Sequence, residues 1–322
     1  MPVSTDEPII AVCCQGADVL ALHSVATGEE IGQISVGGHP VHATVVGDRV
    51  VVATMNERSV TVIDETGELI PIDIGVLGPS HFATVGSMLF VTCTAGDVVA
   101  VIDPIEQTLQ ERIAVGAEPH ELAVGEDFVY VGSRRDGDIS VIEPDRREVI
   151  GQLVVEGDAR IEGIEMSLVA GRGYAVDRTG KRVIAFSLEP SPTIIGEASV
   201  GADPYELTVF DDAIVVPGPG SGEIHEFDRE LCQRDVHHGF ERPVDVVEFA
   251  GERWVIDRSA TVLRSLSGRA IEIPAGAIAA RPNPTGVILS HYDDAAISLV
   301  HPDYGVRWHQ STGEYPFGSL TI

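Results

Sequence analysis

Six side chains that can bind a metal or exchange a proton recur at one position of a repeated motif. The motif opens on Gly-x-x-Pro or a close variant, and the position is the second residue after the proline. The six residues are, in chain order, His42, His81, Glu121, Glu165, Glu206 and Asp245. The placement of Glu165 depends on aligning Gly163 with the prolines, and Glu162 is the competing assignment. Imidazoles and carboxylates in one set indicate a divalent metal site or a metal-free acid/base site.

Repulsion among the carboxylates favours a bound cation. Two carboxylates about 6 Å apart repel by roughly 3 kcal/mol at an effective dielectric constant of about 20. The expected ligands of a divalent metal ion, whose species the sequence leaves open, are His42, His81, Glu121 and Glu206. The expected catalytic residues are Glu165, Asp245, His291 and Tyr292. The alternative is structural: the carboxylates accept hydrogen bonds from backbone amides of the next repeat or are solvated.

Arginines gather in loops that are expected to open on the same face as these six residues. Arg134, Arg178 and Arg258 are the expected contacts of an anionic substrate, because a guanidinium binds a carboxylate or phosphate through two parallel hydrogen bonds. The alternative is that Asp177–Arg178 and Asp257–Arg258 are salt bridges or turn formers within their loops. His120 and Tyr205 each precede a glutamate of the set, and packing between sheets is the favoured role for both.

The elements that must position these residues are short β-strands. Each repeat of about 40 residues divides into four runs rich in Val, Ile and Thr, bounded by Gly, Asp, Asn or Pro, and helical periodicity is absent. One four-stranded sheet cannot bury both of its faces, but sheets stacked radially cover each other. The repeats therefore predict an all-β fold, a β-propeller of eight four-stranded blades around a central channel, with seven blades as the alternative.

The chain ends are expected to complete one hybrid blade from residues 313–322 and 1–36. The C-terminal segment supplies an opening Gly-x-x-Pro and one strand, and the N-terminal segment supplies the three missing strands. We therefore expect residues 1–322 to form a single propeller domain.

The repeats resemble the YVTN family of β-propellers over nearly the whole chain. The segments that carry the resemblance are VGAEPHELAVGEDFVYVGSRRDGDISVIEP and VGADPYELTVFDDAIVVPGPGSGEIHEFD. That family includes surface-layer proteins, binding modules and relatives of lactonases and antibiotic lyases. The resemblance implies a propeller and makes lyase or hydrolase chemistry at the channel mouth an expectation.

Composition narrows the expected partners. The 50 acidic residues outnumber the 21 basic ones, giving a net charge of −29, so a nucleic acid or an anionic membrane is an unfavourable partner. No apolar window is long enough for a transmembrane helix, the first residues lack a signal peptide pattern, and the four cysteines form no disulfide framework, which predicts a cytoplasmic protein. The oligomeric state stays open.

We therefore expect a metal-dependent or acid/base lyase or hydrolase that acts on a small anionic metabolite. The alternative is a non-catalytic YVTN-type propeller that serves as a binding or scaffold protein.

Overall fold

The chain forms only β-strands in residues 7–322, the part that this computed structural model describes. The strands make eight four-stranded antiparallel sheets, the architecture of a β-propeller, so the predicted fold class with eight blades is confirmed. The chain divides into two compact units. The first is Met1–Gly75 with Val244–Ile322, the second is Val76–Pro243, and the single domain stays a prediction.

Residues 1–6, on which the expected lack of a signal peptide partly rests, lie outside the described residues. No helix in the described part is long and apolar enough to span a membrane.

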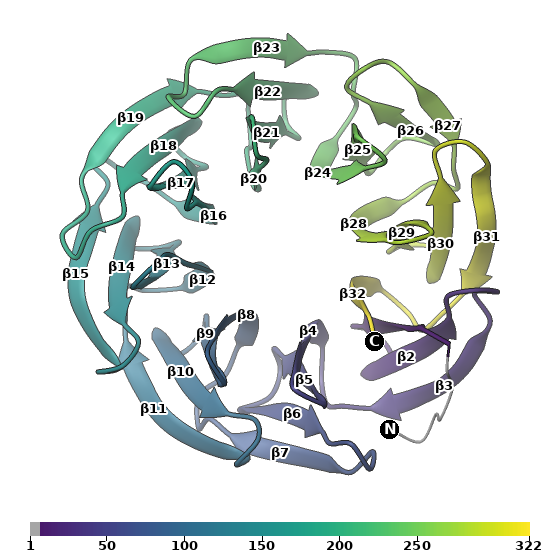
Figure 1. Cartoon of the computed structure of the whole chain (residues 1–322), viewed down its shortest axis with the longest axis horizontal. Helices are drawn as coiled ribbons and strands as arrows, with labels where there is room; N and C mark the ends of the chain where they lie inside the picture. The colour runs from purple at the N-terminus through teal and green to yellow at the C-terminus, as the bar shows by residue number, and fades with distance from the viewer. Residues whose placement is uncertain (1–6) are drawn as a thin grey trace. The chain divides into compact units, whose positions relative to one another are not determined.

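The first unit holds four sheets (Figure 1). One contains β4 (Pro40–Val46), β5 (Arg49–Thr54), β6 (Ser59–Ile63) and β7 (Leu69–Asp73). The next contains β24 (Pro243–Phe249), which begins at the unit boundary, β25 (Glu252–Asp257), β26 (Val262–Ser265) and β27 (Ala270–Glu272). The third contains β28 (Ala277–Asn283), β29 (Gly286–His291), β30 (Ala296–His301) and β31 (Gly305–Ser311).

The fourth sheet of this unit joins the two ends of the chain. It contains β1 (Ile9–Cys14), β2 (Val19–Ser24), β3 (Glu30–Ser35) and β32 (Pro316–Thr321), in the order β3-β2-β1-β32. β1 and β32 pair in antiparallel register, with Ala11 opposite Leu320. The expected hybrid blade is therefore confirmed.

The second unit also holds four sheets, and each is a simple meander. The first two contain β8 (Pro79–Val85), β9 (Met88–Cys93), β10 (Val98–Asp103) and β11 (Thr108–Ala114), then β12 (Pro119–Val124), β13 (Val129–Ser133), β14 (Asp138–Glu143) and β15 (Glu148–Val154). The other two contain β16 (Ile161–Ser167), β17 (Arg172–Asp177), β18 (Arg182–Ser187) and β19 (Ile194–Ser199), then β20 (Thr208–Val209), β21 (Ile214–Gly218), β22 (Glu223–Phe227) and β23 (Gln233–His237).

Burial explains why the middle strands read as unbroken apolar runs. Every residue of β13 is buried, and so is every residue of β1, because neighbouring sheets cover both faces. The fourth strand of a sheet has one covered face, and β3 alternates between exposed and partly buried residues.

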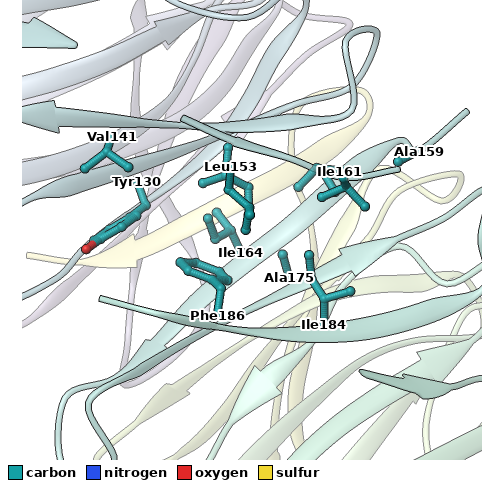
Figure 2. Close-up of a cluster of buried hydrophobic side chains, with 11 residues drawn as sticks. Tyr130, Val141, Leu153, Ala159, Ile161, Ile164, Ala175, Ile184 and Phe186 are labelled. Atoms are coloured by element: carbon teal, nitrogen blue, oxygen red, sulfur yellow. The ribbon is translucent and has the colours of Figure 1, made fainter. Parts of the chain in front are cut away.

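A shared hydrophobic cluster holds sheet β12–β15 against sheet β16–β19. The Tyr130 and Phe186 rings lie against each other with centroids 5.6 Å apart, Ile164 of β16 lies beside Phe186, and Ile161 lies further along the cluster near Ala159 (Figure 2). This packing fixes the start of β16, where the candidate site lies, relative to β12 and β13.

Strand register corrects one sequence alignment. Pro40 lies opposite Thr54, Pro79 opposite Cys93 and Pro119 opposite Ser133, whereas the equivalent residue of β16 is Ile161, opposite Asp177. We number the residue at this place position 1 of its sheet. Position 1 of the fourth repeat is therefore Ile161, and the alignment of Gly163 with the prolines is wrong by two residues.

The correction moves Glu165 away from the predicted ring of titratable groups. Gly163 occupies position 3, the position of His42, His81 and Glu121, and Glu165 lies two residues deeper in β16. Glu162, the competing assignment, lies at position 2. The alignment failed because the repeat's proline is replaced by isoleucine there.

Candidate functional site

Position 2 of the first strands separates the two units chemically. It is polar in the second unit, which places there Ser80, His120 and Glu162, and Tyr205 takes the equivalent place of the repeat just before β20. It is apolar in the four sheets of the first unit, which place there Val41, Val244, Ile278 and Phe317. The second unit therefore carries a row of polar groups on successive sheets, and this row is the start of the candidate site.

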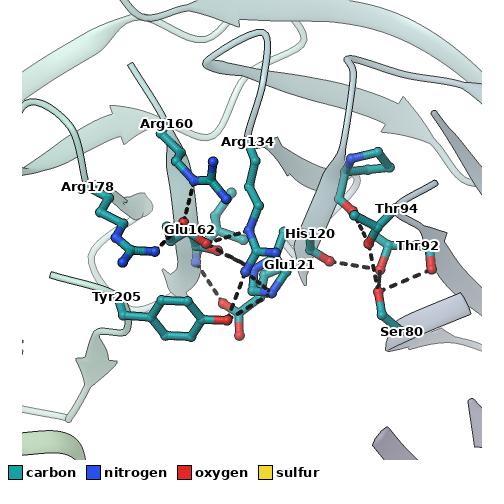
Figure 3. A network of polar contacts seen from close by, with 12 residues as sticks. Ser80, Thr92, Thr94, His120, Glu121, Arg134, Arg160, Glu162, Arg178 and Tyr205 are labelled. Atoms are coloured by element: carbon teal, nitrogen blue, oxygen red, sulfur yellow. Dashed lines mark hydrogen bonds and ion pairs between the residues drawn. The ribbon is translucent and has the colours of Figure 1, made fainter. Parts of the chain in front are cut away.

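Glu162 is the centre of the site, and three arginines surround it (Figure 3). Its side chain is fully buried, with 0% exposed. Arg134 Nε donates to Oε2 at 2.5 Å, Arg160 Nε donates to Oε1 at 2.6 Å and Arg178 lies 3.3 Å from Oε1. Burial on its own raises the pKa of this carboxyl, but the arginines and His120 outweigh burial, and its pKa is lowered overall. Glu162 is therefore ionised at neutral pH.

His120 is a neutral imidazole in a fixed tautomer. Its Nδ1 lies 2.9 Å from the carbonyl oxygen of Glu162, which only accepts, so Nδ1 carries the hydrogen. Its Nε2 lies 2.6 Å from Arg134 NH2, which only donates. Burial, with Arg134 next, lowers the pKa of His120 to about 4. The imidazole therefore acts as an acceptor that orients Arg134.

Tyr205 completes the contacts of Arg134. Arg134 NH2 donates to the Tyr205 hydroxyl oxygen at 2.8 Å, and the Arg134 and Arg178 guanidiniums lie 5.7 and 5.8 Å from the ring centroid. Burial, opposed by Arg134 and reinforced by nearby glutamates, raises the pKa of Tyr205 to about 12. The hydroxyl stays protonated, and within residues 7–322 its hydrogen has only the already occupied Nε2 of His120, at 3.4 Å, as a partner.

Of the two loop alternatives, the salt bridge between Asp177 and Arg178 is not formed, but Asp177 does form a turn, because its Oδ1 accepts from the amide of Gly180 at 3.0 Å. Arg178 pairs with Asp203, with Nε 2.7 Å from Oδ1, and not with its neighbour Asp177. Asp177 instead accepts from Arg182 Nε at 3.0 Å and from the Arg160 amide at 3.1 Å. Asp177 thus fixes the turn that carries Arg160.

Arg160 keeps two nitrogens free for a ligand. Its guanidinium is held through Nε by Glu162, and its NH1 and NH2 make no hydrogen bond to a described residue. Its side chain is 40% exposed. A guanidinium that is held at Nε and open at both terminal nitrogens can bind an oxyanion through two parallel hydrogen bonds.

Hydroxyl groups tie the neighbouring sheet to this cluster. Thr92 Oγ1 donates to the carbonyl oxygen of His120 at 2.8 Å, and Thr94 Oγ1 donates to that of Pro119 at 2.8 Å. His81 lies against His120, with ring centroids 4.4 Å apart. The second unit therefore brings His81, Arg134 and Arg178 of the sequence predictions to one cluster.

The carboxylates near position 3 bond the next sheet of their own unit. Glu121 Oε2 accepts from the amide of Ile164 at 3.0 Å, and Glu165 Oε2 accepts from the amide of Val209 at 2.6 Å. In the first unit, Asp245 makes the same kind of bond to the backbone of Ala280. The structural alternative is thus observed for all three carboxylates.

Replacing Glu121 by glutamine is expected to lower the free energy of unfolding by about 1 kcal/mol, because a charge-assisted hydrogen bond to Ile164 becomes a neutral one. Urea denaturation at pH 7 measures this change. Glu106→Gln, on an exposed turn of the same unit, is the matched control and should stay within about 0.5 kcal/mol of wild type. A gain in stability for Glu121→Gln would show instead that repulsion between carboxylates dominates.

The predicted metal ligands do not form a recognisable metal centre. Among residues 7–322, no group of three or more His, Cys, Asp or Glu side chains is arranged to hold a metal ion. His42 lies in the first unit, edge-on to Phe317 at 5.6 Å, while His81, Glu121 and Glu206 lie in the second. The divalent metal stays a prediction, and no chemical step is derived through it.

The other predicted site residues lie in the first unit. His291 is fully buried, with Nδ1 2.8 Å from the carbonyl oxygen of Ala275 and Nε2 2.8 Å from Ser298 Oγ, and burial lowers its pKa. Burial likewise raises the pKa of Asp245. Tyr292 donates to Gln15 at 2.8 Å, and Arg258 lies 5.8 Å from the Tyr292 ring centroid. Their catalytic and substrate-binding roles stay predictions.

Sequence reasoning did not identify Arg160 or Asp203, it gave Glu162 only as the competing assignment for Glu165, and it favoured packing for His120 and Tyr205. A signal was present. The segment GDARIEG departs from the chain's own repeat by placing arginine before position 1, isoleucine at it and glutamate after it. A break in a repeat marks a residue that the common fold does not require.

Comparison with known proteins supports the β-propeller fold and assigns no function. No protein-family model matches the chain, and no curated protein matches it by sequence. Similar solved structures include apo AztD from Citrobacter koseri, with 12% identity, a TM-score of 0.74 and 98% of each chain covered. The dihydro-heme d1 dehydrogenase NirN in complex with DHE has 12% identity and a TM-score of 0.78, over 97% of this chain and 74% of that one.

A third similar structure is virginiamycin B lyase from Staphylococcus aureus, with 11% identity and a TM-score of 0.64, over 79% of this chain and 90% of that one. These neighbours are β-propellers, and the chain is therefore a protein of the propeller class. At this level of identity the likeness extends to the fold alone.

Proposed function

We propose that this chain is a propeller that binds a small anionic ligand at the arginine cluster of its second unit. The observation that carries the proposal is the guanidinium of Arg160, which Glu162 fixes at Nε while NH1 and NH2 have no partner among the described residues. Arg134 and Arg178 are engaged with protein groups, so their role is to hold Glu162 and thereby Arg160. The primary contact to a ligand is thus Arg160, with the Tyr205 hydroxyl as a second donor.

The pKa values support binding rather than proton transfer. A general acid or base works best with a pKa close to the working pH. The pKa of His120 is about 4 and that of Tyr205 is about 12, so neither group exchanges a proton readily near pH 7. Tyr205 therefore suits a site that presents a fixed hydrogen-bond donor to an acceptor, and His120 suits one that holds Arg134 in place.

A second candidate is a cytoplasmic, YVTN-type lyase or hydrolase with a divalent metal or acid/base site. Two observations favour it: His81, a predicted ligand, lies against His120 beside the cluster, and a virginiamycin B lyase is among the similar structures. Metal analysis of protein purified without chelator separates the candidates. Stoichiometric metal that is lost in His81→Ala supports the metal-dependent enzyme, and wild-type protein without metal contradicts that form of it.

Replacing Arg160 by glutamine is expected to weaken binding of acetate at least tenfold, which corresponds to about 1.4 kcal/mol, because the paired donors are lost. Isothermal titration calorimetry at low ionic strength measures the affinity. Arg146→Gln is the control, because Arg146 is 62% exposed and pairs only with Glu143 and Glu148. Equal affinities in wild type and Arg160→Gln, or no saturable binding to wild type, would contradict the proposal.

A further inference from the structure

The cluster has a positive and a negative side, and Tyr205 lies where the two meet. Arg134, Arg160 and Arg178 form its positive side. Glu121 and Glu206 form its negative side, because Glu121 Oε2 is bound to the amide of Ile164 and the backbone of Glu206 packs against Gly163, the neighbour of Glu162. Figure 3 shows Glu121 beside His120 and Tyr205. Both glutamates act electrostatically on the Tyr205 hydroxyl and help to raise its pKa.

The positive side has room for one negative charge. Its three arginines are hydrogen-bonded to two carboxylates, Glu162 and Asp203, which leaves one positive charge unbalanced. A dianion placed there would face Glu121 and Glu206 with its second charge. In a protein of net charge −29 that second charge has no nearby compensation.

We propose that the ligand is a zwitterion, an amino acid or amino-acid-like molecule with one carboxylate and one ammonium group. This inference rests on the proposed function, because it assigns the carboxylate to Arg160. The ammonium then lies toward Glu121 and Glu206, and the Tyr205 hydroxyl donates to an oxygen of the ligand's carboxylate. The same two glutamates that repel a dianion attract the ammonium.

Matched probes with and without an amino group test the inference. The pairs are glycine with acetate, β-alanine with propionate, and γ-aminobutyrate with butyrate, each titrated calorimetrically at pH 7. For at least one pair, whose spacing fits the site, we expect the amino acid to bind about tenfold more tightly than its partner. The three chain lengths measure the separation of the positive and negative sides.

Variants then assign the preference to particular residues. Glu206→Gln and Glu121→Gln, alone and together, should reduce the preference for the amino acid toward unity while the simple carboxylate still binds. Arg160→Gln should weaken both members of every pair, and Glu106→Gln should change neither. Two different glutamates are tested so that a folding defect in one variant does not decide the result.

The outcomes separate this inference from the proposed function. If carboxylates bind through Arg160 but no amino acid binds more tightly than its partner, the zwitterion is wrong and the anion site stands. If none of the six probes binds saturably, both are wrong. A preference that survives the double glutamate variant also overturns the zwitterion.

Discussion

Replacing Glu162 by glutamine is expected to lower the free energy of unfolding by about 3 kcal/mol, the largest effect of any single substitution proposed for this chain. The buried carboxylate holds three guanidiniums, and Arg134, with 17% of its side chain exposed, would be left as a nearly buried charge with no counterion. Removing one partner of a buried pair costs more than the pair contributes, because the remaining charge stays desolvated. Urea denaturation at pH 7 with two independent probes measures the loss.

Asp203→Asn provides the matched control. Asp203 also pairs with Arg178, at 2.6 Å, but its side chain is 44% exposed, and exposed pairs contribute at most about 1 kcal/mol. A loss below 1 kcal/mol for Glu162→Gln, equal to that of the control, would mean that solvent compensates the arginines and that Arg160 is not held in place.

Acid is expected to destabilise the protein through His120. The pKa of this imidazole is about 4 in the folded protein, against an ordinary value of 6.5, because burial and Arg134 disfavour the cation. Between pH 6.5 and about pH 4 the unfolded chain binds a proton that the folded protein does not. The free energy of unfolding therefore decreases as the pH is lowered through this range, and it keeps its full value above pH 6.5. One pKa unit corresponds to 1.36 kcal/mol, which gives a loss of up to about 3 kcal/mol.

The variant His120→Gln isolates this contribution from those of the carboxylates. Glutamine has no titration in this range, so the difference in unfolding free energy between wild type and variant should shrink by about 2 to 3 kcal/mol from pH 7 to pH 4.5. Chemical denaturation at both pH values measures it. A difference that is constant with pH would show that His120 titrates alike in both states.

The fold follows from local sequence rules because every repeat obeys them. The apolar runs in β5, β9 and β13 are buried on both faces, and the prolines at Pro40, Pro79 and Pro119 mark the first strands. The hybrid sheet was equally predictable, because each end of the chain carries the strands that the other lacks. Regular strands need only apolar runs and turn residues, which a single sequence displays.

The site was less predictable because it is built where the repeat fails. Arg134 and Arg178 were identified as loop arginines, but their shared partner Glu162 was hidden by the two-residue shift at Ile161. The direction of a side chain at a β-bulge is likewise not readable from sequence, and register shifts occur at the start of β8, β12 and β16. The structure was therefore needed to show which of two adjacent residues, such as His120 and Glu121, contacts the arginines.

The ring of six titratable groups illustrates the same limit. Common repeat positions correctly predicted that Glu121 and Asp245 occupy equivalent places on their strands, but not that each bonds a backbone amide of the next sheet. The position of a residue in the repeat therefore predicts its place on a strand. The role of its side chain depends on the hydrogen-bond partner, which the structure shows.

The Nε–Hε resonances of arginine test the central claim most directly. In protein labelled with ¹⁵N-arginine, the signal of Arg160, assigned by its loss in Arg160→Gln, is predicted to shift saturably on addition of β-alanine or acetate, while the signal of Arg146 stays in place. An Arg160 signal that does not move, or that moves no more than Arg146 at the same concentrations, would contradict an anion site on this guanidinium.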